Sequence, residues 1–366
     1  MPKKNKIIIA AGGTGGHLFP AQTFAEEVLQ KNSNCQLLFA GHGLTTNRYF
    51  AKERFDFKEV LSSSPFQKGR KEIWKNSWQL VRGIKESMKV LSDFDPDLVV
   101  GFGSFHAFPL LAAAVLRNTS FVLFESNVMP GKVTRLLSRW ARITAVQFPQ
   151  AARYLRGSVA KVSMPIRYHN TDFLSVKEAR NYFYLDPDIF TFLVFGGSQG
   201  AVSINEKFCK AAAQLKKRGI VFQVIHLTGK QTDVDNVKKE YEKLGISSCV
   251  KDFESNMGYA WKAASFAICR AGASTIAEEI AFEVPAILIP YPHASDDHQT
   301  KNAQVMANEI KGALYILESQ LEEDLLFKKM SEIIEDSRSL QVMRQSLKEF
   351  KNENQTQDFF SLIDKL

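Results

Sequence analysis

The feature that most constrains the fold is a glycine-rich turn that occurs twice, each time directly after a short apolar run. Residues 7–9 lead into AAGGTGGH at 10–17, and FTFLVF at 190–195 leads into GGSQGA at 196–201. A continuous run of β-branched or aromatic residues is typical of a strand buried on both faces of a parallel sheet. Apolar residues at helical spacing follow both turns. Each segment is therefore predicted to be a strand, a tight turn and a helix.

A turn of this kind is suited to binding an anion. Glycine has no Cβ, so the backbone can approach a ligand closely, and the unpaired N–H groups and dipole of the following helix favour phosphate. A plain tight turn is the alternative, although one glycine would suffice for most turns. Neither turn continues as the Gly-Lys-Ser/Thr of ATP-binding loops. The dinucleotide fingerprint is also absent, because the expected second strand ends in LLFAGHG without a carboxylate.

A third strand-to-helix passage, ICRAGASTIAEEIA at 268–281, has the same form. Its Ser274 and Thr275 can donate hydrogen bonds at the start of a helix. Adjacent helical residues point about 100° apart, so only one of Glu278 and Glu279 can face a ligand. A carboxylate there could accept two hydrogen bonds from a ribose diol, and the other is expected on the solvated helix face.

The 366 residues are enough for two domains, and apolar strand candidates alternate with helical stretches along the whole chain. This pattern predicts an α/β fold with two Rossmann-like parallel-sheet domains facing across a cleft, each with its own glycine turn. The first domain is predicted to span 1–164 and to include a C-terminal helix at 345–366. The second is predicted to span 165–344.

The net charge of +8 is compatible with anionic partners, and much of it gathers at 67–89. Apolar side chains on one stripe of this segment, including Trp74 and Trp78, predict an amphipathic helix on an anionic membrane surface. A core-facing helix with a solvated charged face is the alternative. We expect the membrane contacts at Lys68, Arg70, Lys71, Trp74 and Trp78. Nucleic acid is not expected, because basic and aromatic residues are not interleaved along a groove. No apolar run is long and uninterrupted enough to span a membrane.

Metal binding is not expected either. The four cysteines lack the spacing of metal ligands and are predicted to be free thiols. The segment HASDDHQ, with His293 and His298, is rich in acidic and imidazole groups. It follows PYP, is rich in loop-forming residues and lacks an i, i+4 His pair on a helix, so a metal site is not expected there.

Eight motifs appear in an order that carries a resemblance to a known family. They are GGTGGHLFPA, PDLVVGFGS, ESNVMPG, MPIR, FGGSQGAVSIN, HLTGK, CRAGASTIAEE and VPAILIPYPHASDDHQTKNA. With them, nearly the whole chain resembles the MurG family of bacterial glycosyltransferases. The resemblance implies the GT-B architecture and an inverting, metal-independent hexosyltransferase. It implies transfer of GlcNAc from UDP-GlcNAc to the 4-hydroxyl of MurNAc in undecaprenyl-linked lipid I, giving lipid II for peptidoglycan. It implies a peripheral protein on the cytoplasmic face of the cell membrane, near cell-wall assembly proteins. UDP-GlcNAc is a substrate, and no cofactor is expected.

The resemblance also implies site residues. Those expected to bind the donor are Thr14, Gly15, Gly16, Asn127, Arg167, Ser198, Glu254, Ala273, Ser274, Thr275, Ile276, Ala277, Glu278 and Gln299. Glu278 would meet the ribose, and the backbone after Phe253 would meet uracil, which makes the identity of Glu254 unimportant. Those expected to bind the acceptor pyrophosphate are Gly13, Gly103 and Ser104.

His17 is the candidate general base that deprotonates the acceptor hydroxyl. Its place at a predicted helix N-terminus disfavours the imidazolium form. A His that only positions substrate is the alternative. Arg167 and the helix N-termini would stabilise the departing UDP without a metal.

The sequence departs from the family mainly in the first domain. Ser104 and Phe105 replace Gly-Tyr, Phe124 and Ser126 replace His and Gln, and Met164 and Ile166 replace Asn and Val. These changes concern the acceptor pyrophosphate more than the donor. Two other functions are compatible with the sequence: a related transferase that glycosylates diacylglycerol, and a catalytically silent membrane scaffold. The presence of His17, Arg167 and Glu278 argues against the scaffold.

Overall fold

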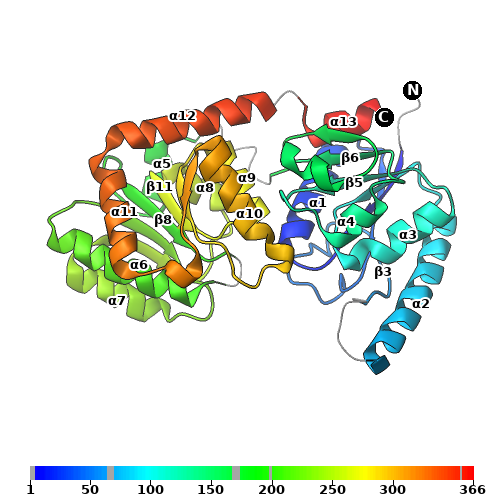
Figure 1. The fold of residues 1–366 in the computed structure, drawn as a ribbon, viewed down its shortest axis with the longest axis horizontal. Helices are drawn as coiled ribbons and strands as arrows, with labels where there is room; N and C mark the ends of the chain where they lie inside the picture. The colour runs from blue at the N-terminus through cyan, green and yellow to red at the C-terminus, as the bar shows by residue number, and fades with distance from the viewer. Residues whose placement is uncertain (1–4, 64–69, 167–173, 198–199, 355–356) are drawn as a thin grey trace. The chain divides into compact units, whose positions relative to one another are not determined.

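The chain folds into two compact units, each built on a parallel β-sheet (Figure 1). The computed structural model describes residues 5–63, 70–166, 174–197, 200–354 and 357–366. The first unit comprises residues 1–167 and 354–366, and the second comprises residues 168–353. Two such units confirm the predicted α/β fold class.

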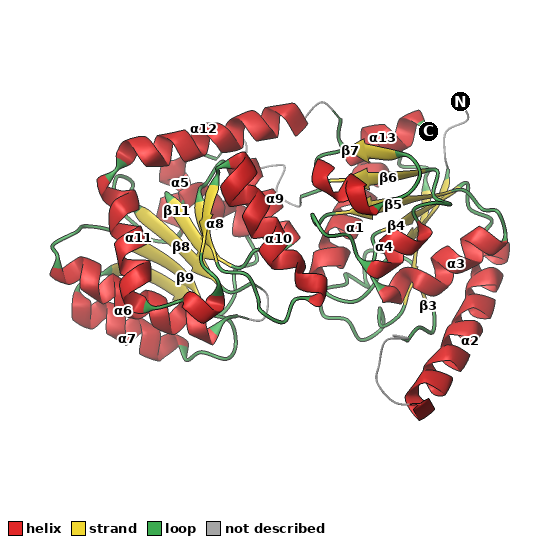
Figure 2. Cartoon of the chain, viewed as in Figure 1, coloured by secondary structure: helices red, strands yellow, loops and turns green. Residues whose placement is uncertain are grey.

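The first unit has seven parallel strands among its described residues, in the order β3-β2-β1-β4-β5-β6-β7. Helices connect the strands (Figure 2). The elements are β1 Lys6–Ala10, α1 Gly15–Lys31, β2 Gln36–Gly41, β3 Phe57–Glu59, α2 Arg70–Phe94, β4 Leu98–Gly101, η1 Phe105–Ala107, α3 Phe108–Leu116, β5 Phe121–Glu125, α4 Lys132–Leu137, β6 Ile143–Val146, η2 Pro149–Tyr154, β7 Val159–Lys161 and α13 Phe359–Lys365. The central pairing sets Ile8 opposite both Leu38 on β2 and Val99 on β4.

The described part of the second unit has six parallel strands, in the order β10-β9-β8-β11-β12-β13. Its elements are α5 Val176–Tyr182, β8 Thr191–Phe195, α6 Val202–Lys217, β9 Gln223–Leu227, α7 Val234–Leu244, β10 Ser247–Lys251, α8 Met257–Ala263, β11 Phe266–Cys269, α9 Ala273–Phe282, β12 Ala286–Leu288, η4 Ser295–Asp297, α10 His298–Gln304, η5 Val305–Ile310, β13 Ala313–Tyr315, η6 Glu318–Gln320, α11 Glu323–Glu335 and α12 Ser337–Asn354.

The C-terminal stretch 345–366 is two helices and not one. α12 ends at Asn354 and belongs to the second unit up to Glu353, whereas α13 belongs to the first. Phe359 anchors α13 in the first unit and is almost fully buried. Its ring lies 4.9 Å from that of Phe24 on α1 and 5.0 Å from that of Phe124 on β5. Phe102, directly after β4, completes the cluster at 5.7 Å from Phe359.

The core of the second unit contains a carboxyl group without a partner. Glu279 on α9 is fully buried, so it does not lie on the solvated helix face expected from the sequence. Neither of its oxygens accepts a hydrogen bond from any described residue. Burial therefore raises the pKa of Glu279 well above its usual value. An ionised carboxylate without a partner would be costly in such a place, so burial favours the protonated form of the side chain.

We expect Phe359→Ala to lower the free energy of unfolding of the first unit by about 3–5 kcal/mol, the usual cost of removing a buried aromatic ring. Equilibrium urea unfolding measures the change. Phe360→Ala on the same helix is the matched control, because Phe360 is only half-buried and should cost clearly less. Equal losses for the two variants would show that α13 is not anchored through Phe359.

We expect Glu279→Met to stabilise the protein, and to do so more as the pH rises. The folded state keeps Glu279 protonated above the usual carboxyl pKa, so the unfolded state releases a proton first. Wild-type stability relative to the variant is therefore highest near pH 4 and falls toward pH 8, by up to about 1.4 kcal/mol per pH unit. Urea unfolding at several pH values measures the difference. Glu242→Met, at an exposed position on α7, should show no such trend. A pH-independent difference at Glu279 would contradict the protonated assignment.

Candidate active site

The glycine turn after β1 starts α1 in the first unit. Gly13 has φ +88°, a conformation that side-chain-bearing residues rarely adopt. Thr14 is the N-cap of α1, and its side chain makes no capping hydrogen bond. The exposed backbone at Thr14 and Gly16 therefore meets the requirements for an anion site at a helix N-terminus.

His106, which the sequence analysis did not single out, explains why the turn needs two successive glycines. A Cβ at Gly12 would lie 2.7 Å from the His106 Cβ, and one at Gly13 would lie 2.8 Å from the His106 Nδ1. Burial, together with the nearby His42 and His17, lowers the pKa of His106 to about 4. The ring is therefore neutral at physiological pH. It packs against the turn without adding positive charge there.

Ser104 also belongs to this arrangement and carries an unusual backbone. Its φ of +70° is rare for a residue other than glycine. The Ser104 hydroxyl lies 2.7 Å from the His106 Nδ1 and accepts a hydrogen bond from the His106 backbone N–H at 3.3 Å. It also lies 3.2 Å from where a Cβ on Gly13 would be. The structure thus brings together the predicted pyrophosphate residues Gly13 and Ser104.

The predicted base, His17, lies in the first turn of α1. Its Nδ1 is 2.8 Å from the backbone oxygen of Phe102. A carbonyl oxygen can only accept, so Nδ1 carries the proton and the basic lone pair of the neutral ring is on Nε2. Gly103, with φ +73°, passes beside this ring, and a Cβ there would lie 3.5 Å from the His17 Cε1. The third predicted pyrophosphate residue is therefore next to the predicted base.

Glu125 holds the loop that contains the predicted donor residue Asn127. One carboxylate oxygen accepts hydrogen bonds from the Asn127 backbone N–H at 3.0 Å and its side-chain amide at 3.1 Å. The other accepts from the Gly131 N–H at 3.0 Å. Both oxygens of this buried carboxylate accept hydrogen bonds from the loop, and these bonds fix the course of its backbone. Glu125 could not be identified from the sequence, because its role depends on the folded conformation of the loop.

In the second unit, the predicted donor residues 273–278 form the first turns of α9. Thr275 and Glu278 are partly exposed, so their side chains can reach a ligand. Ser274 is also partly exposed as a residue, but its hydroxyl oxygen is buried and has no hydrogen-bond partner among the described residues. The side chain of Ile276 is fully buried and can offer only its backbone. Burial raises the pKa of Glu278 to about 7, against the opposing effect of a hydrogen bond from Trp261. The Trp261 Nε1–H donates to Glu278 Oε2 at 2.7 Å.

Glu254 has a structural role that the expectation of an unimportant side chain missed. It is buried and accepts hydrogen bonds from Lys251 Nζ at 2.7 Å and from the Asn256 backbone N–H at 2.8 Å. Burial alone would raise its pKa, but these hydrogen bonds outweigh that effect and hold the pKa of Glu254 below its usual value. The side chain thus fixes the loop whose backbone is predicted to meet uracil.

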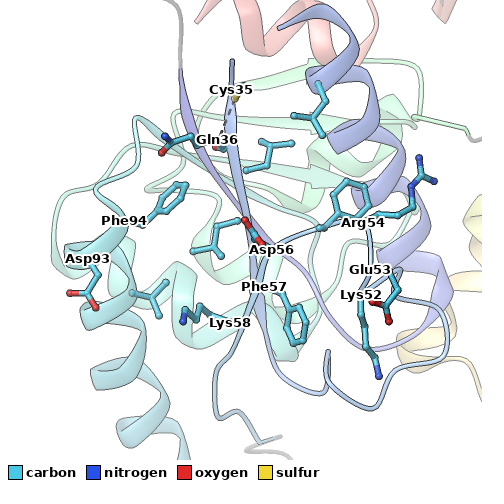
Figure 3. Close-up of a pocket in the computed structure, with 15 residues that line it drawn as sticks. Cys35, Gln36, Lys52, Glu53, Arg54, Asp56, Phe57, Lys58, Asp93 and Phe94 are labelled. Atoms are coloured by element: carbon cyan, nitrogen blue, oxygen red, sulfur yellow. Dashed lines mark hydrogen bonds between the residues drawn. The ribbon is translucent and has the colours of Figure 1, made fainter. Parts of the chain in front are cut away.

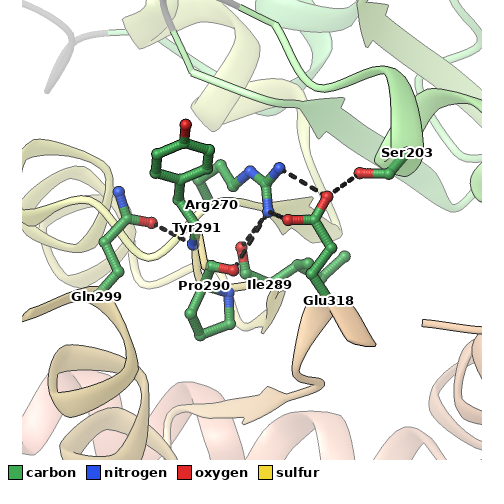
Figure 4. A network of polar contacts seen from close by, with 7 residues as sticks. All are labelled: Ser203, Arg270, Ile289, Pro290, Tyr291, Gln299 and Glu318. Carbon is green, nitrogen blue, oxygen red and sulfur yellow. Dashed lines mark hydrogen bonds and ion pairs between the residues drawn. The ribbon is translucent and has the colours of Figure 1, made fainter. Parts of the chain in front are cut away.

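An ion-pair network supports the predicted donor residue Gln299 (Figure 4). Arg270, directly after β11, makes two hydrogen bonds to the Glu318 carboxylate at 2.9 and 3.0 Å. Its Nη1 also donates to the backbone oxygen of Pro290 at 3.2 Å. The next residue, Tyr291, donates its backbone N–H to Gln299 Oε1 at 2.9 Å. The Gln299 side-chain oxygen is therefore committed to the protein, and its NH₂ group is the part that can donate to a ligand.

Several predicted features lie outside these arrangements. Arg167, Ser198 and Lys68 fall outside the described residues, as do the side chains of Arg70, Lys71 and Trp74. Across the described parts of the chain, no group of His, Cys, Asp and Glu side chains could hold a metal ion. A hollow of about 810 Å³ opens in the first unit among Leu37, Phe57, Phe94 and neighbouring side chains (Figure 3). It lies by the first residues of β2, whereas sites in such folds form at the carboxyl ends of strands.

The predicted amphipathic helix is α2, and its apolar stripe divides into two parts. Ile84 and Met88 pack against the core of the first unit. Trp78 and Val81 are 63% and 54% exposed. The core-facing alternative thus applies to the C-terminal half, and exposed apolar side chains remain nearer the N-terminus. None of the described helices is long and apolar enough to cross a membrane.

Comparison with known proteins matches both units to one family. The glycosyltransferase family 28 N-terminal domain matches residues 7–146, and its C-terminal domain matches residues 191–358. The UDP-N-acetylglucosamine–N-acetylmuramyl-(pentapeptide) pyrophosphoryl-undecaprenol N-acetylglucosamine transferase of Protochlamydia amoebophila is 42% identical, over 90% of this chain and 88% of its own length. The transferase of the same name from Chlamydia pneumoniae is 34% identical over 99% of both chains.

Solved structures show the same fold. The crystal structure of Acinetobacter baumannii MurG superimposes with a TM-score of 0.74, at 24% identity over 99% of this chain and 100% of that one. A UDP-glucose:anthocyanidin 3-O-glucosyltransferase in complex with UDP superimposes with a TM-score of 0.68, at 12% identity over 100% of this chain and 98% of that one. Both family domains, the high identity and the near-complete coverage agree: the chain belongs to glycosyltransferase family 28 and, within it, to the MurG family of N-acetylglucosamine transferases.

Proposed function

We propose that the protein transfers GlcNAc from UDP-GlcNAc to the 4-hydroxyl of MurNAc in undecaprenyl-linked lipid I, giving lipid II. The observation that carries this proposal is the 42% identity to the Protochlamydia transferase over 90% of the chain, together with the arrangement of His17. A diacylglycerol acceptor remains the second candidate, and assays with each lipid acceptor and labelled UDP-GlcNAc distinguish the two.

The proposed reaction is a single inverting displacement. His17 Nε2 takes the proton of the acceptor hydroxyl, and the oxygen of that hydroxyl attacks the anomeric carbon from the face opposite UDP. The Phe102 carbonyl supports this role because it keeps the ring in the tautomer that has a basic Nε2. Asn127, Thr14, Gly15 and Gly16 are proposed to contact the GlcNAc end of the donor.

We assign the donor nucleotide to the second unit. Glu278 accepts hydrogen bonds from the ribose hydroxyls, and the backbone beside Glu254 meets uracil. The N-terminus of α9 at 273–277, with Ser198, Arg167 and Gln299, stabilises the charge on the departing UDP. Neither a metal ion nor a cofactor takes part in this proposal.

We also propose that the protein works at the cytoplasmic face of the cell membrane, because its lipid substrate is there. Trp78 and Val81 are exposed on α2 beside the exposed cations Arg82, Lys85 and Lys89. Exposed apolar side chains flanked by cations suit the headgroup region of an anionic bilayer. We propose further membrane contacts at Lys68, Arg70, Lys71 and Trp74 on the basis of the sequence. Cell-wall assembly proteins are the other partners proposed.

We expect His17→Ala to lower kcat by about 10²- to 10⁴-fold, the usual contribution of a general base. The Kd for UDP should stay nearly unchanged, because the nucleotide is assigned to the other unit. Steady-state kinetics and UDP titration measure the two quantities. His17→Gln keeps a polar side chain that cannot act as a base. If His17→Gln restored most of the turnover, His17 would only position the acceptor.

We expect replacement of Trp78 and Val81 together by Ala to weaken binding to phosphatidylglycerol vesicles about tenfold, because two exposed apolar side chains no longer enter the headgroup region. Vesicle co-sedimentation at fixed ionic strength measures this. Tyr184→Ala in the second unit is the control, because Tyr184 is 95% exposed and lies outside the proposed surface. Unchanged vesicle binding by the double variant would contradict the membrane role of α2.

A further inference from the structure

The carboxylate of the partly exposed Glu278 is held by a buried residue, Trp261. This Trp lies on α8, a short helix that precedes β11, and its side chain is fully buried. Its Nε1–H donates to Glu278 Oε2 at 2.7 Å. The indole itself is held by the ring of Phe195, the last residue of β8, which meets it edge-to-face at 5.7 Å and 89°. A fixed donor therefore determines where one oxygen of Glu278 lies.

This hydrogen bond leaves Glu278 with enough acceptor capacity for a diol. An ionised carboxylate offers about four lone-pair positions, and Trp261 occupies one of them. The remaining positions can accept both hydroxyls of a ribose. A neutral carboxyl could not do this as well, because its own O–H would have to be turned away from the ligand.

The environment of Glu278 otherwise opposes ionisation. Burial raises its pKa to about 7, and the Trp261 hydrogen bond acts in the opposite direction. Trp261 therefore favours the charged form of the carboxylate as well as its orientation. Neighbouring Glu279 shows what burial does without such a donor, since its pKa lies well above the usual carboxyl value.

We infer that Trp261 is a positioning residue for the donor nucleotide, and that its N–H holds Glu278 in the orientation that accepts the two ribose hydroxyls. The inference rests on the proposed function, in which Glu278 binds the ribose. Trp261 would then contribute to the preference for ribose over deoxyribose nucleotides without touching the ligand. Loss of the N–H should weaken the binding of UDP more than the binding of a nucleotide that lacks the diol.

The test replaces only the N–H group. Genetic incorporation of β-(3-benzothienyl)alanine at position 261 keeps the shape of the indole and puts sulfur where the N–H was. Titration with UDP and with 2′,3′-dideoxy-UDP gives the preference of each protein for the diol. We expect that preference to fall about tenfold, as for the loss of one hydrogen bond to a charged group. The same replacement at the partly exposed Trp140, in the first unit, should leave it unchanged.

A pH series separates positioning from simple packing. In the wild type, the preference for UDP over its dideoxy analogue should rise with pH as Glu278 ionises. Both ligands carry the same diphosphate, so its titration cancels. In the benzothienyl variant the midpoint of this rise should move to higher pH. A variant with altered packing alone would keep the wild-type midpoint, and that result would overturn the inference. Trp261→Phe, measured in the same way, provides a second variant.

Glu278→Gln distinguishes the two proposals. If this variant keeps the wild-type preference for UDP, Glu278 does not bind the ribose and the proposed donor assignment fails. If Glu278→Gln loses the preference while the benzothienyl protein retains it, the donor assignment stands and the role of Trp261 is refuted. Loss of the preference in both variants, with the pH shift in the second, supports both.

Discussion

The first unit depends on the adjacency of β1 and β4 in its sheet. Because these strands are parallel neighbours, the chain leaves both at the same edge, and the Phe102 N–H donates to Ala10 at 3.0 Å. The backbone oxygen of Phe102 accepts a hydrogen bond from the His17 Nδ1–H. The ring of Phe102 packs against Phe24 in the aromatic cluster. One residue thus connects the sheet, the core and the candidate base. The neutral ring of His106 fills the space above the glycine turn.

The second unit shows how one residue type serves different purposes through its surroundings. Glu318 is paired with Arg270, Glu278 accepts a single indole hydrogen bond, and Glu279 has no hydrogen bond from a described residue. Along this series the carboxyl pKa goes from below its usual value, to about 7, to well above the usual value. Only the middle group combines partial exposure with a charge that can be gained or lost near neutrality. It is therefore the one suited to a ligand.

The parts of this structure that could be predicted are those in which residues close together in the sequence determine the local structure. The glycine turn after β1, the start of α9 and the described part of the amphipathic α2 each show their pattern within about twenty residues, and each forms the predicted element. The strands β3, β7, β10 and β13 were not predicted from the sequence. β10 has the sequence SSCVK, which lacks a continuous apolar run, and the other three have only three residues each. The supporting contacts of the site were also not predictable. His106 meets Gly13 only because β1 and β4 pair, and Trp261 meets Glu278 only because α8 and α9 pack against each other.

The departure at Phe124 has a simple explanation in the packing. Its ring lies 5.4 Å from that of Phe102 and 5.0 Å from that of Phe359, so it belongs to the cluster that supports the loops. That cluster imposes an order on biosynthesis. Phe359 leaves the ribosome only after all residues of the second unit, yet it completes the core of the unit that was synthesised first. The unit that carries the candidate base therefore lacks the ring that packs against Phe102 until the end of translation. By that stage all strands of the second unit have been synthesised. Domains generally fold in the order of their synthesis, whereas the first unit of this protein lacks one of its core rings until the second unit has been synthesised.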